Sequence, residues 1–317
     1  MGLGVIFHHF VGMGHPYIQG ALTAEQFDQL LTSVGVHKFL DPLSWAAARM
    51  SGTLGDDQHC LTFDDALQSQ IDIALPVLES HGLKAFFFVY SSVLEGHMEL
   101  FEIYRYFKNQ FYDSIDSFYH DFYAELARQV GSSSFREELA SEEAHGYLHQ
   151  YSFYSDADRR FRYVRDRLLS SEQYETIMAK LMAACDTSPA TIADNIWIGV
   201  PGLKRIQKGG HLVGLHSHTH PTNMVTMARD LQEIEYTSNM ECLVRVLGYR
   251  PDTMAHASGS YNQDTLDILH ALGVKLGFRS DDGVGGGTML ELPRLDYKLF
   301  VERYLEPRVL AAALGQN

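Results

Sequence analysis

Long hydrophobic runs are missing from this sequence. No apolar stretch is long enough to cross a bilayer, and the N-terminus has no basic residues ahead of its first apolar run, residues 3–7. Two histidines follow that run directly, so it does not resemble a secretion signal. We therefore expect a cytoplasmic protein with no membrane span.

Cysteine is scarce as well. The chain has three, Cys60, Cys185 and Cys242, which lie far apart and include no CxxC pair. An odd number of widely spaced cysteines argues against a disulfide framework and against a cysteine-based metal site. We expect these thiols to be reduced and buried.

Basic residues are also few compared with acidic ones. The 317 residues include 25 lysines and arginines against 40 aspartates and glutamates, which gives a formal net charge of -15 and a pI of about 5.4. Nucleic acids and anionic membrane surfaces attract basic patches, so we expect no nucleic-acid partner. An acidic enzyme with a small or neutral substrate fits this charge better.

Strand-like and helix-like segments alternate along most of the chain. Residues 3–7, 60–63 and 84–90 are apolar and strand-prone, and residues 68–80 between the last two have helical spacing of apolar positions. Strand, helix, strand in this order predicts a parallel sheet or barrel covered by helices. The alternation resumes at residue 199, with strands expected at 211–215, 253–256, 274–278 and 290–295 and a terminal helix at 309–314.

The stretch from about residue 95 to 195 has a different pattern. It has no glycine between Gly96 and Gly131, no convincing strand, and aromatic residues at helical spacing. We interpret it as a mainly helical insertion in a single domain that spans residues 1–317. Its aromatic rings could stack on sugars, but rings at this spacing more often form a core.

Two adjacent acids, Asp64 and Asp65, end the second predicted strand. Neighbouring side chains within a strand point to opposite faces, so both acids can serve one site only where the strand gives way to a loop. The alternative is that they cap the following helix, since aspartate is a favoured capping residue.

Three histidines at alternate positions, His216, His218 and His220, follow the predicted strand at 211–215. Pro221 disfavours the α region for the residue before it, so these side chains leave the strand end on a loop. Two imidazoles and one carboxylate with open coordination positions suit a catalytic divalent metal. Such a metal lowers the pKa of bound water from about 15.7 toward about 7, and the second aspartate could take a proton from that water.

Three segments resemble motifs of one family. Residues 62–66 (TFDDA) are similar to the TFDDG motif of the polysaccharide deacetylase family, also known as the NodB homology family or carbohydrate esterase family 4. Residues 216–221 (HSHTHP) resemble its HSxxHP motif, and residues 259–262 (GSYN) its PYGSYN segment. The resemblance implies an α/β fold, a distorted (β/α) barrel of about seven strands, with the site at the strand C-termini.

The resemblance also implies roles for single residues. Asp64 would be the catalytic base, and Asp65, His216 and His220 would bind the metal, usually Zn²⁺, with Co²⁺, Ni²⁺ or Fe²⁺ as alternatives. Ser217 would hold the loop by hydrogen bonding. The reaction implied is hydrolysis of an N-acyl amide on a sugar.

The third motif departs from the family pattern. The chain has Ala255-His256-Ala257-Ser258-Gly259 where an Arg and a Pro usually precede Tyr-Gly. The backbone N–H of Ser258 could still stabilise the oxyanion, because that role needs no particular side chain. Gly259 and Tyr261 are the neighbouring candidates for substrate contact.

The usual histidine of the fifth motif is also not evident. We expect Arg294, in its place, to orient Asp64 and keep it ionised through a charge-assisted pair. The leaving amine then needs another acid, and His9 and His256 are the candidates, because histidine titrates near neutrality. Finally, Ala66 stands where the family usually has glycine, which predicts a turn without left-handed backbone.

The leading hypothesis is therefore a metal-dependent hydrolase that removes an acetyl or formyl group from an amino sugar, on a nucleotide-linked or lipid-linked precursor. One alternative is a degenerate family member that binds a saccharide without turnover. Another is a non-haem iron enzyme, which uses the same set of two histidines and one carboxylate. The sequence predicts no oligomeric state.

Overall fold

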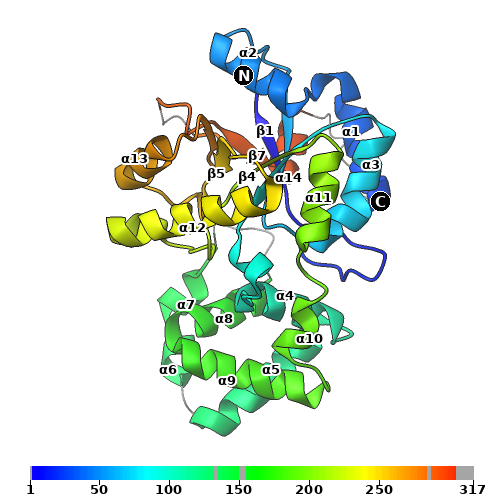
Figure 1. The fold of residues 1–317 in the computed structure, drawn as a ribbon. Helices are drawn as coiled ribbons and strands as arrows, with labels where there is room; N and C mark the ends of the chain where they lie inside the picture. Colours follow the sequence, from blue (N-terminus) through cyan, green and yellow to red (C-terminus); the bar gives the residue numbers. More distant parts are fainter. Residues whose placement is uncertain (1, 132–134, 150–154, 284–286, 305–317) are drawn as a thin grey trace. The chain divides into compact units, whose positions relative to one another are not determined.

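The computed structural model describes residues 2–131, 135–149, 155–283 and 287–304 of the chain (Figure 1). The chain divides into two compact units. Unit 1 comprises Met1–Glu99 and Ile196–Asn317, and unit 2 comprises Leu100–Asn195. Within the described ranges, no helix combines the length and the apolar character that a membrane crossing requires.

Unit 1 is built on one sheet of seven strands in which every pair is parallel. The strand order is β6-β5-β4-β3-β2-β1-β7. The strands are β1 Gly4–Phe7, β2 Cys60–Phe63, β3 Phe86–Val89, β4 Leu212–Leu215, β5 Thr253–Ala255, β6 Leu276–Phe278 and β7 Arg294–Asp296. The predicted α/β fold, a distorted (β/α) barrel of seven strands, is confirmed.

The two edge strands of this sheet approach each other through the segment ahead of β7. An isolated parallel bridge joins Phe278 of β6 to Leu292, and the backbone N–H of Arg279 donates to the Leu292 carbonyl at 2.9 Å. These contacts nearly close the barrel. The last strand starts later than the predicted 290–295, because Pro293 has no N–H to give to the ladder.

Helices cover the strands of unit 1 (Figure 1). They are α1 Ala24–Val34, α2 Pro42–Ser51, α3 Leu75–Ser80, α11 Val200–Lys208, α12 Arg229–Leu247, α13 Gln263–Ala271 and α14 Tyr297–Tyr304. Helices α2 and α14 are not among the predicted elements, although Asp41 caps α2 and Gly52 ends it in a left-handed conformation. The helix predicted at 309–314 lies outside the described residues.

The core of unit 1 is aromatic where β1, β2 and β3 lie side by side. The rings of Phe63 and Phe87 are 4.7 Å apart between centroids, and those of Phe7 and Phe63 are 5.4 Å apart. Each of β1, β2 and β3 has four residues, and all of them are buried, as expected for strands covered on both faces. Cys60 and Cys242 are buried free thiols, whereas Cys185 is half-buried.

Unit 2 has helices but no strand among its described residues. Its helices are α4 Leu100–Gln110, α5 Ile115–Val130, α6 Arg136–Leu139, α7 Glu142–Gly146, α8 Asp156–Tyr163, α9 Ser171–Ala184 and α10 Pro189–Ala193. Phe107, Phe118, Phe122 and Phe161 are fully buried. Most of the aromatic residues at helical spacing therefore form the core of this unit, while Phe101 and Phe111 remain exposed.

Candidate metal centre and active site

The predicted acids and histidines meet at one edge of the sheet. Asp64 and Asp65 follow the last residue of β2, and His216 follows the last residue of β4. Since β3 alone separates these two parallel strands, their C-terminal ends lie at the same edge. This is the edge at which barrels of this kind carry their sites.

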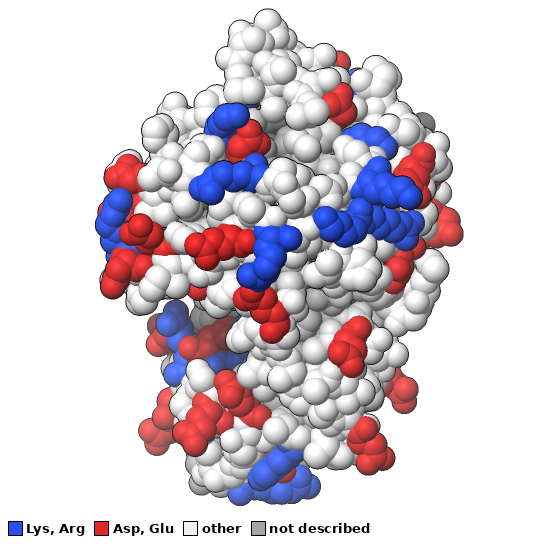
Figure 2. Space-filling view, in the orientation of Figure 1, with Lys and Arg blue, Asp and Glu red and all other residues white. Residues whose placement is uncertain are grey.

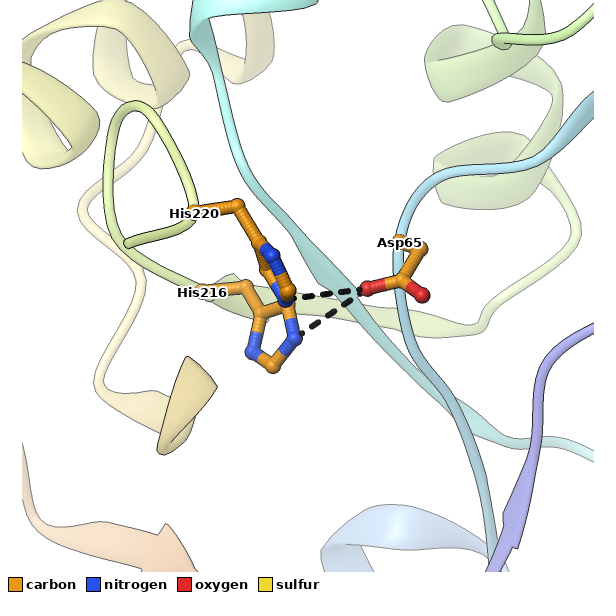
Figure 3. Close-up of side chains that lie close together, drawn as sticks. All are labelled: Asp65, His216 and His220. Carbon is orange, nitrogen blue, oxygen red and sulfur yellow. Dashed lines mark ion pairs between the residues drawn. The ribbon is translucent and has the colours of Figure 1, made fainter. Parts of the chain in front are cut away.

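Asp65, His216 and His220 form a compact set of possible metal ligands (Figure 3). Asp65 Oδ1 lies 3.4 Å from Nε2 of His216 and 3.4 Å from Nε2 of His220. One ligand atom from each residue lies within 4.8 Å of the others. Asp65 Oδ1 is buried and has no hydrogen-bond donor among the described residues, so a cation would satisfy it.

The ring of His216 is held with Nε2 toward Asp65. Its Nδ1 lies 2.8 Å from the Ala255 carbonyl oxygen, so Nδ1 carries the proton and donates it there. Nε2 then presents a lone pair, as a metal-binding histidine must. The donor set and its outer hydrogen bond both fit a divalent metal.

The loop that carries both histidines is fastened to α12. Glu235 accepts hydrogen bonds from the backbone N–H groups of His218 and Thr219 at 2.8 Å each, and from the Thr219 hydroxyl at 2.6 Å. Asn239, one turn later on the same helix, accepts from the His216 N–H at 3.0 Å and donates to the Val89 carbonyl at 2.9 Å. This pair of residues escaped the sequence analysis.

Two further side chains of the loop have defined partners. The Ser217 hydroxyl accepts from the His220 N–H at 3.2 Å, so it ties the two ends of the loop together. His218 turns away from the ligand set, and its Nδ1 lies 2.9 Å from the Ser91 hydroxyl.

Left-handed backbone is concentrated at this edge. Asp65 and Ala66 have φ values of 73° and 55°, and Ser217, His220 and Ser258 have φ values of 65°, 58° and 53°. Non-glycine residues in this region cost of order 1–3 kcal/mol each, and such strain collects at functional sites.

We expected the turn at Ala66 to avoid a left-handed backbone, and this prediction was wrong. Alanine occupies a left-handed conformation there, because the surrounding structure holds both sides of the turn. The Ala66 carbonyl accepts from the Ile198 N–H at 2.9 Å, and Gln70 Nε2 donates to the Asp64 carbonyl at 2.6 Å. These bonds offset a conformation that alanine adopts poorly.

Asp64 forms a bidentate ion pair with Arg294. The guanidinium NH1 and NH2 groups donate to Oδ1 and Oδ2 at 2.8 Å each, and the Arg294 side chain is 0% exposed. Arg294 also donates from Nε to the Arg279 carbonyl at 2.7 Å. Burial alone would raise the pKa of Asp64, but the Arg294 guanidinium outweighs it and the pKa is lowered.

The first strand brings His8 to the acids. His8 Nε2 lies 3.9 Å from Asp65 Oδ2, and the His8 side chain is 38% exposed. His9, one of the predicted proton donors, is the next residue, and its ring centroid lies 6.4 Å from that of His8.

His256 has the surroundings of a structural histidine. It is buried, its Nε2 donates to the Leu290 carbonyl at 2.8 Å, and its ring stacks on Tyr261 with centroids 4.1 Å apart. Burial lowers the pKa of His256 to about 4, so its ring is neutral near pH 7. We therefore do not retain it as proton donor.

The predicted oxyanion segment lies directly after β5. Ser258 is exposed, and a Cβ on Gly259 would come within 2.2 Å of the Ser280 hydroxyl oxygen, which explains glycine there. The Tyr261 hydroxyl donates to Glu291 Oε1 at 3.0 Å. The segment therefore lies at the same edge of the sheet as the ligand set. The proton of the Tyr261 hydroxyl is already donated to Glu291.

Part of this sequence matches the model of a known protein family. The family model described as polysaccharide deacetylase matches residues 189–277, which include β4, both histidines of the possible ligand set and the predicted oxyanion segment. A search of curated proteins finds no match to this sequence.

Several solved structures share the fold at low sequence identity. The deacetylase PplD of Streptococcus pyogenes, solved in complex with acetate, is 16% identical with a TM-score of 0.57, over 96% of this chain and 98% of that one. IcaB from Ammonifex degensii is 15% identical with a TM-score of 0.52, over 99% and 97%. A de-N-acetylase from Aggregatibacter actinomycetemcomitans is 11% identical with a TM-score of 0.55, over 95% and 98%.

At these identities the solved structures show a shared fold. The similarity to the family comes from the match of residues 189–277. The matched range holds two of the three possible ligands, and the remaining acid motif follows β2 at the same edge. The chain is thus similar to the polysaccharide deacetylase family over residues 189–277.

Proposed function

We propose that this chain is a metal-dependent hydrolase that removes an acetyl or formyl group from the amino nitrogen of an amino sugar. One observation carries the proposal: the ligand set Asp65, His216 and His220 adjoins a second carboxylate, Asp64, held by Arg294. A binding site alone would need the ligand set but not the additional buried, ionised acid.

Asp65, His216 and His220 would hold the metal, with Zn²⁺ the expected ion and Co²⁺, Ni²⁺ or Fe²⁺ as alternatives. A divalent cation held there would supply Lewis acidity toward the amide carbonyl and would make water more acidic. The three residues leave further coordination positions to water and substrate, as a catalytic site requires.

Asp64 would accept the proton of the attacking water. Its lowered pKa keeps it ionised near neutrality, and Arg294 fixes its orientation. A carboxylate has about four lone-pair sites, so a bidentate arginine leaves acceptor capacity on both oxygens. The base is thus positioned and charged before substrate binds.

The leaving amine would receive its proton from His8. Its ring reaches the acids from the end of β1 and remains partly exposed, so it can exchange protons with solvent. The Ser258 backbone N–H, at the end of β5, would stabilise the negative charge on the amide oxygen.

The substrate class we propose is an N-acylated amino sugar carried on a nucleotide or a lipid. A screen of such compounds for released acetate and formate tests the proposal. Release that stops when a chelator removes the metal, and returns with Zn²⁺ under anaerobic conditions, is the expected result.

Two outcomes would replace the proposal with an alternative. Metal binding without release from any N-acetyl or N-formyl amino sugar would indicate a saccharide-binding member without turnover. Turnover that requires iron and molecular oxygen would indicate a non-haem iron enzyme.

A further inference from the structure

Gln70 is a polar side chain that lies inside unit 1. Acidic and basic side chains are intermixed at the surface of this unit, on the face that Figure 2 shows, whereas Gln70 is only 1% exposed. It is the first residue of the segment Gln70–Ala74, which is π-helical. Single π-helical turns are rare and occur frequently at functional sites.

The side-chain amide of Gln70 joins the ends of β1 and β2. Its Nε2 donates to the His8 carbonyl at 2.9 Å and to the Asp64 carbonyl at 2.6 Å. The hydroxyl of the preceding residue, Ser69, accepts from the Phe10 N–H at 3.3 Å. Residues 69 and 70 therefore fasten the chain after β1 to the turn after β2.

The orientation of the Gln70 amide follows from its two partners. Both are carbonyl oxygens, which only accept hydrogen bonds, so the NH2 group of Gln70 must face them. Its Oε1 is then buried, and none of the described residues donates to it. An unpaired buried oxygen costs free energy that an apolar side chain of similar length would avoid. The amide therefore serves the two carbonyls at a cost in stability.

The Asp64 carbonyl belongs to the peptide group that precedes Asp65. Fixing this peptide group restricts rotation about the N–Cα bond of Asp65, whose φ is 73°, and Ala66 follows with a φ of 55°. Residues other than glycine prefer a negative φ. Without the bond to this carbonyl the turn can relax. Asp65 Oδ1 would then leave its position 3.4 Å from Nε2 of His216 and 3.4 Å from Nε2 of His220.

The second bond of Gln70 holds the backbone of His8, whose ring approaches the same carboxylate. His8 Nε2 lies 3.9 Å from Asp65 Oδ2. One buried amide thus fixes the backbone at His8 and the backbone that leads into Asp65.

We propose that Gln70 is a positioning residue that holds Asp65 in its metal-binding conformation. The inference rests on the proposed function, because it takes Asp65, His216 and His220 as the metal ligands. Loss of the Gln70 amide lowers the fraction of molecules in which the turn is formed. The apparent affinity for the metal falls in proportion to that fraction.

The affinity of the full chain for Zn²⁺, measured by competition with a fluorescent chelator, tests the proposal. Gln70→Met keeps the length of the side chain but removes both hydrogen-bond donors. It should weaken Zn²⁺ binding by about tenfold or more, as expected for a residue behind a metal ligand. Gln68→Met is the matched control, because Gln68 lies two positions earlier and its Nε2 donates to Asp72 Oδ1 at 2.9 Å. It should leave the affinity for Zn²⁺ unchanged.

Ala66→Gly separates positioning from a general loss of packing. Glycine adopts a positive φ without the cost that alanine bears, so the turn needs less support from Gln70. In the Ala66→Gly background, Gln70→Met should therefore weaken Zn²⁺ binding by no more than about threefold, which is a coupling between the two residues. A merely structural role for Gln70 predicts the same loss in both backgrounds.

Gln70→Asn keeps the test decisive if Gln70→Met folds poorly. Its amide is one methylene shorter and should not reach both carbonyls, so it should also weaken Zn²⁺ binding. Equal Zn²⁺ affinities of wild type and the Gln70 variants, or losses that Ala66→Gly does not reduce, would overturn the proposal, as would wild-type protein that binds no Zn²⁺. These measurements involve no acyl substrate. A failure of the proposed hydrolase reaction would appear separately, as Zn²⁺ bound without acyl release.

Discussion

Both carboxylate oxygens of Asp64 accept hydrogen bonds from the guanidinium of Arg294, a residue 230 positions later in the chain. The sheet explains how they meet. Strand β7, which begins with Arg294, pairs with β1, and β1 pairs with β2, after which Asp64 follows. The final strand of the barrel thus supplies the cation that keeps the acid of the second strand ionised.

Replacing Arg294 should damage both stability and activity. Arg294→Met leaves a buried carboxylate without its partner, which typically costs about 3–5 kcal/mol of unfolding free energy. The pKa of Asp64 should then rise, since burial is no longer opposed, and the acid limb of the pH profile of kcat should move to higher pH.

Arg294→Lys is the control for that experiment. Lysine keeps the positive charge but cannot form two parallel hydrogen bonds, so its effect on the pH profile should be smaller. A Met variant whose pH profile equals that of wild type would show that Arg294 does not set the ionisation of Asp64.

Glu235 should govern metal affinity without touching the metal site directly. Glu235→Gln weakens the bonds to the His218 and Thr219 N–H groups, which place His220. Residues behind metal ligands typically change affinity by about 10–100-fold. Competition with a fluorescent zinc chelator measures this, and we expect weaker Zn²⁺ binding with little change in melting temperature.

Glu241→Gln is the matched control on the same helix, because Glu241 is exposed on α12. It should leave the affinity for Zn²⁺ unchanged. Equal affinities for Zn²⁺ in the two variants would mean that the loop keeps its shape without the Glu235 bonds.

Buried neutral histidines should make the protein sensitive to mild acid. Burial lowers the pKa of His59, His211 and His256 to about 4, whereas an unfolded chain titrates near the ordinary histidine value of about 6.5. Between these values the unfolded state binds more protons, so the unfolding free energy falls as the pH falls from about 6.5 to about 4.

His211→Gln isolates one of these groups, away from the metal ligands. His211 Nδ1 accepts from the Ala85 N–H at 3.1 Å, and a glutamine oxygen can accept in its place. Urea unfolding at several pH values should show a shallower decline for the variant than for wild type, by up to about 1.4 kcal/mol per pH unit. Identical slopes would show that His211 does not titrate in this range.

Local signals in the sequence were enough to name the three residues that the structure brings together as possible metal ligands. Asp65 and His216 lie within two residues of the ends of the apolar strands β2 and β4, and His220 lies on the loop after β4. Parallel strands bring such ends together. Arg294 could be named because its place in the last strand resembles that of a family motif.

Other features depend on contacts that the sequence does not encode locally. The approach of His8 to Asp65 depends on the path of the chain after β1. The left-handed Ala66 depends on its bond to Ile198, and the role of Glu235 on where α12 packs.

In the proposed mechanism the two adjacent acids have separate tasks: Asp65 binds the metal and Asp64 accepts the proton of the attacking water. The most direct test measures bound metal and released acyl group together for the wild type, Asp64→Asn and His216→Ala. We predict that Asp64→Asn keeps its metal but loses acyl release by at least about 100-fold, the lower range for a general base, while His216→Ala loses the metal itself. Asp64→Asn protein that releases acetate or formate at the wild-type rate would contradict the account.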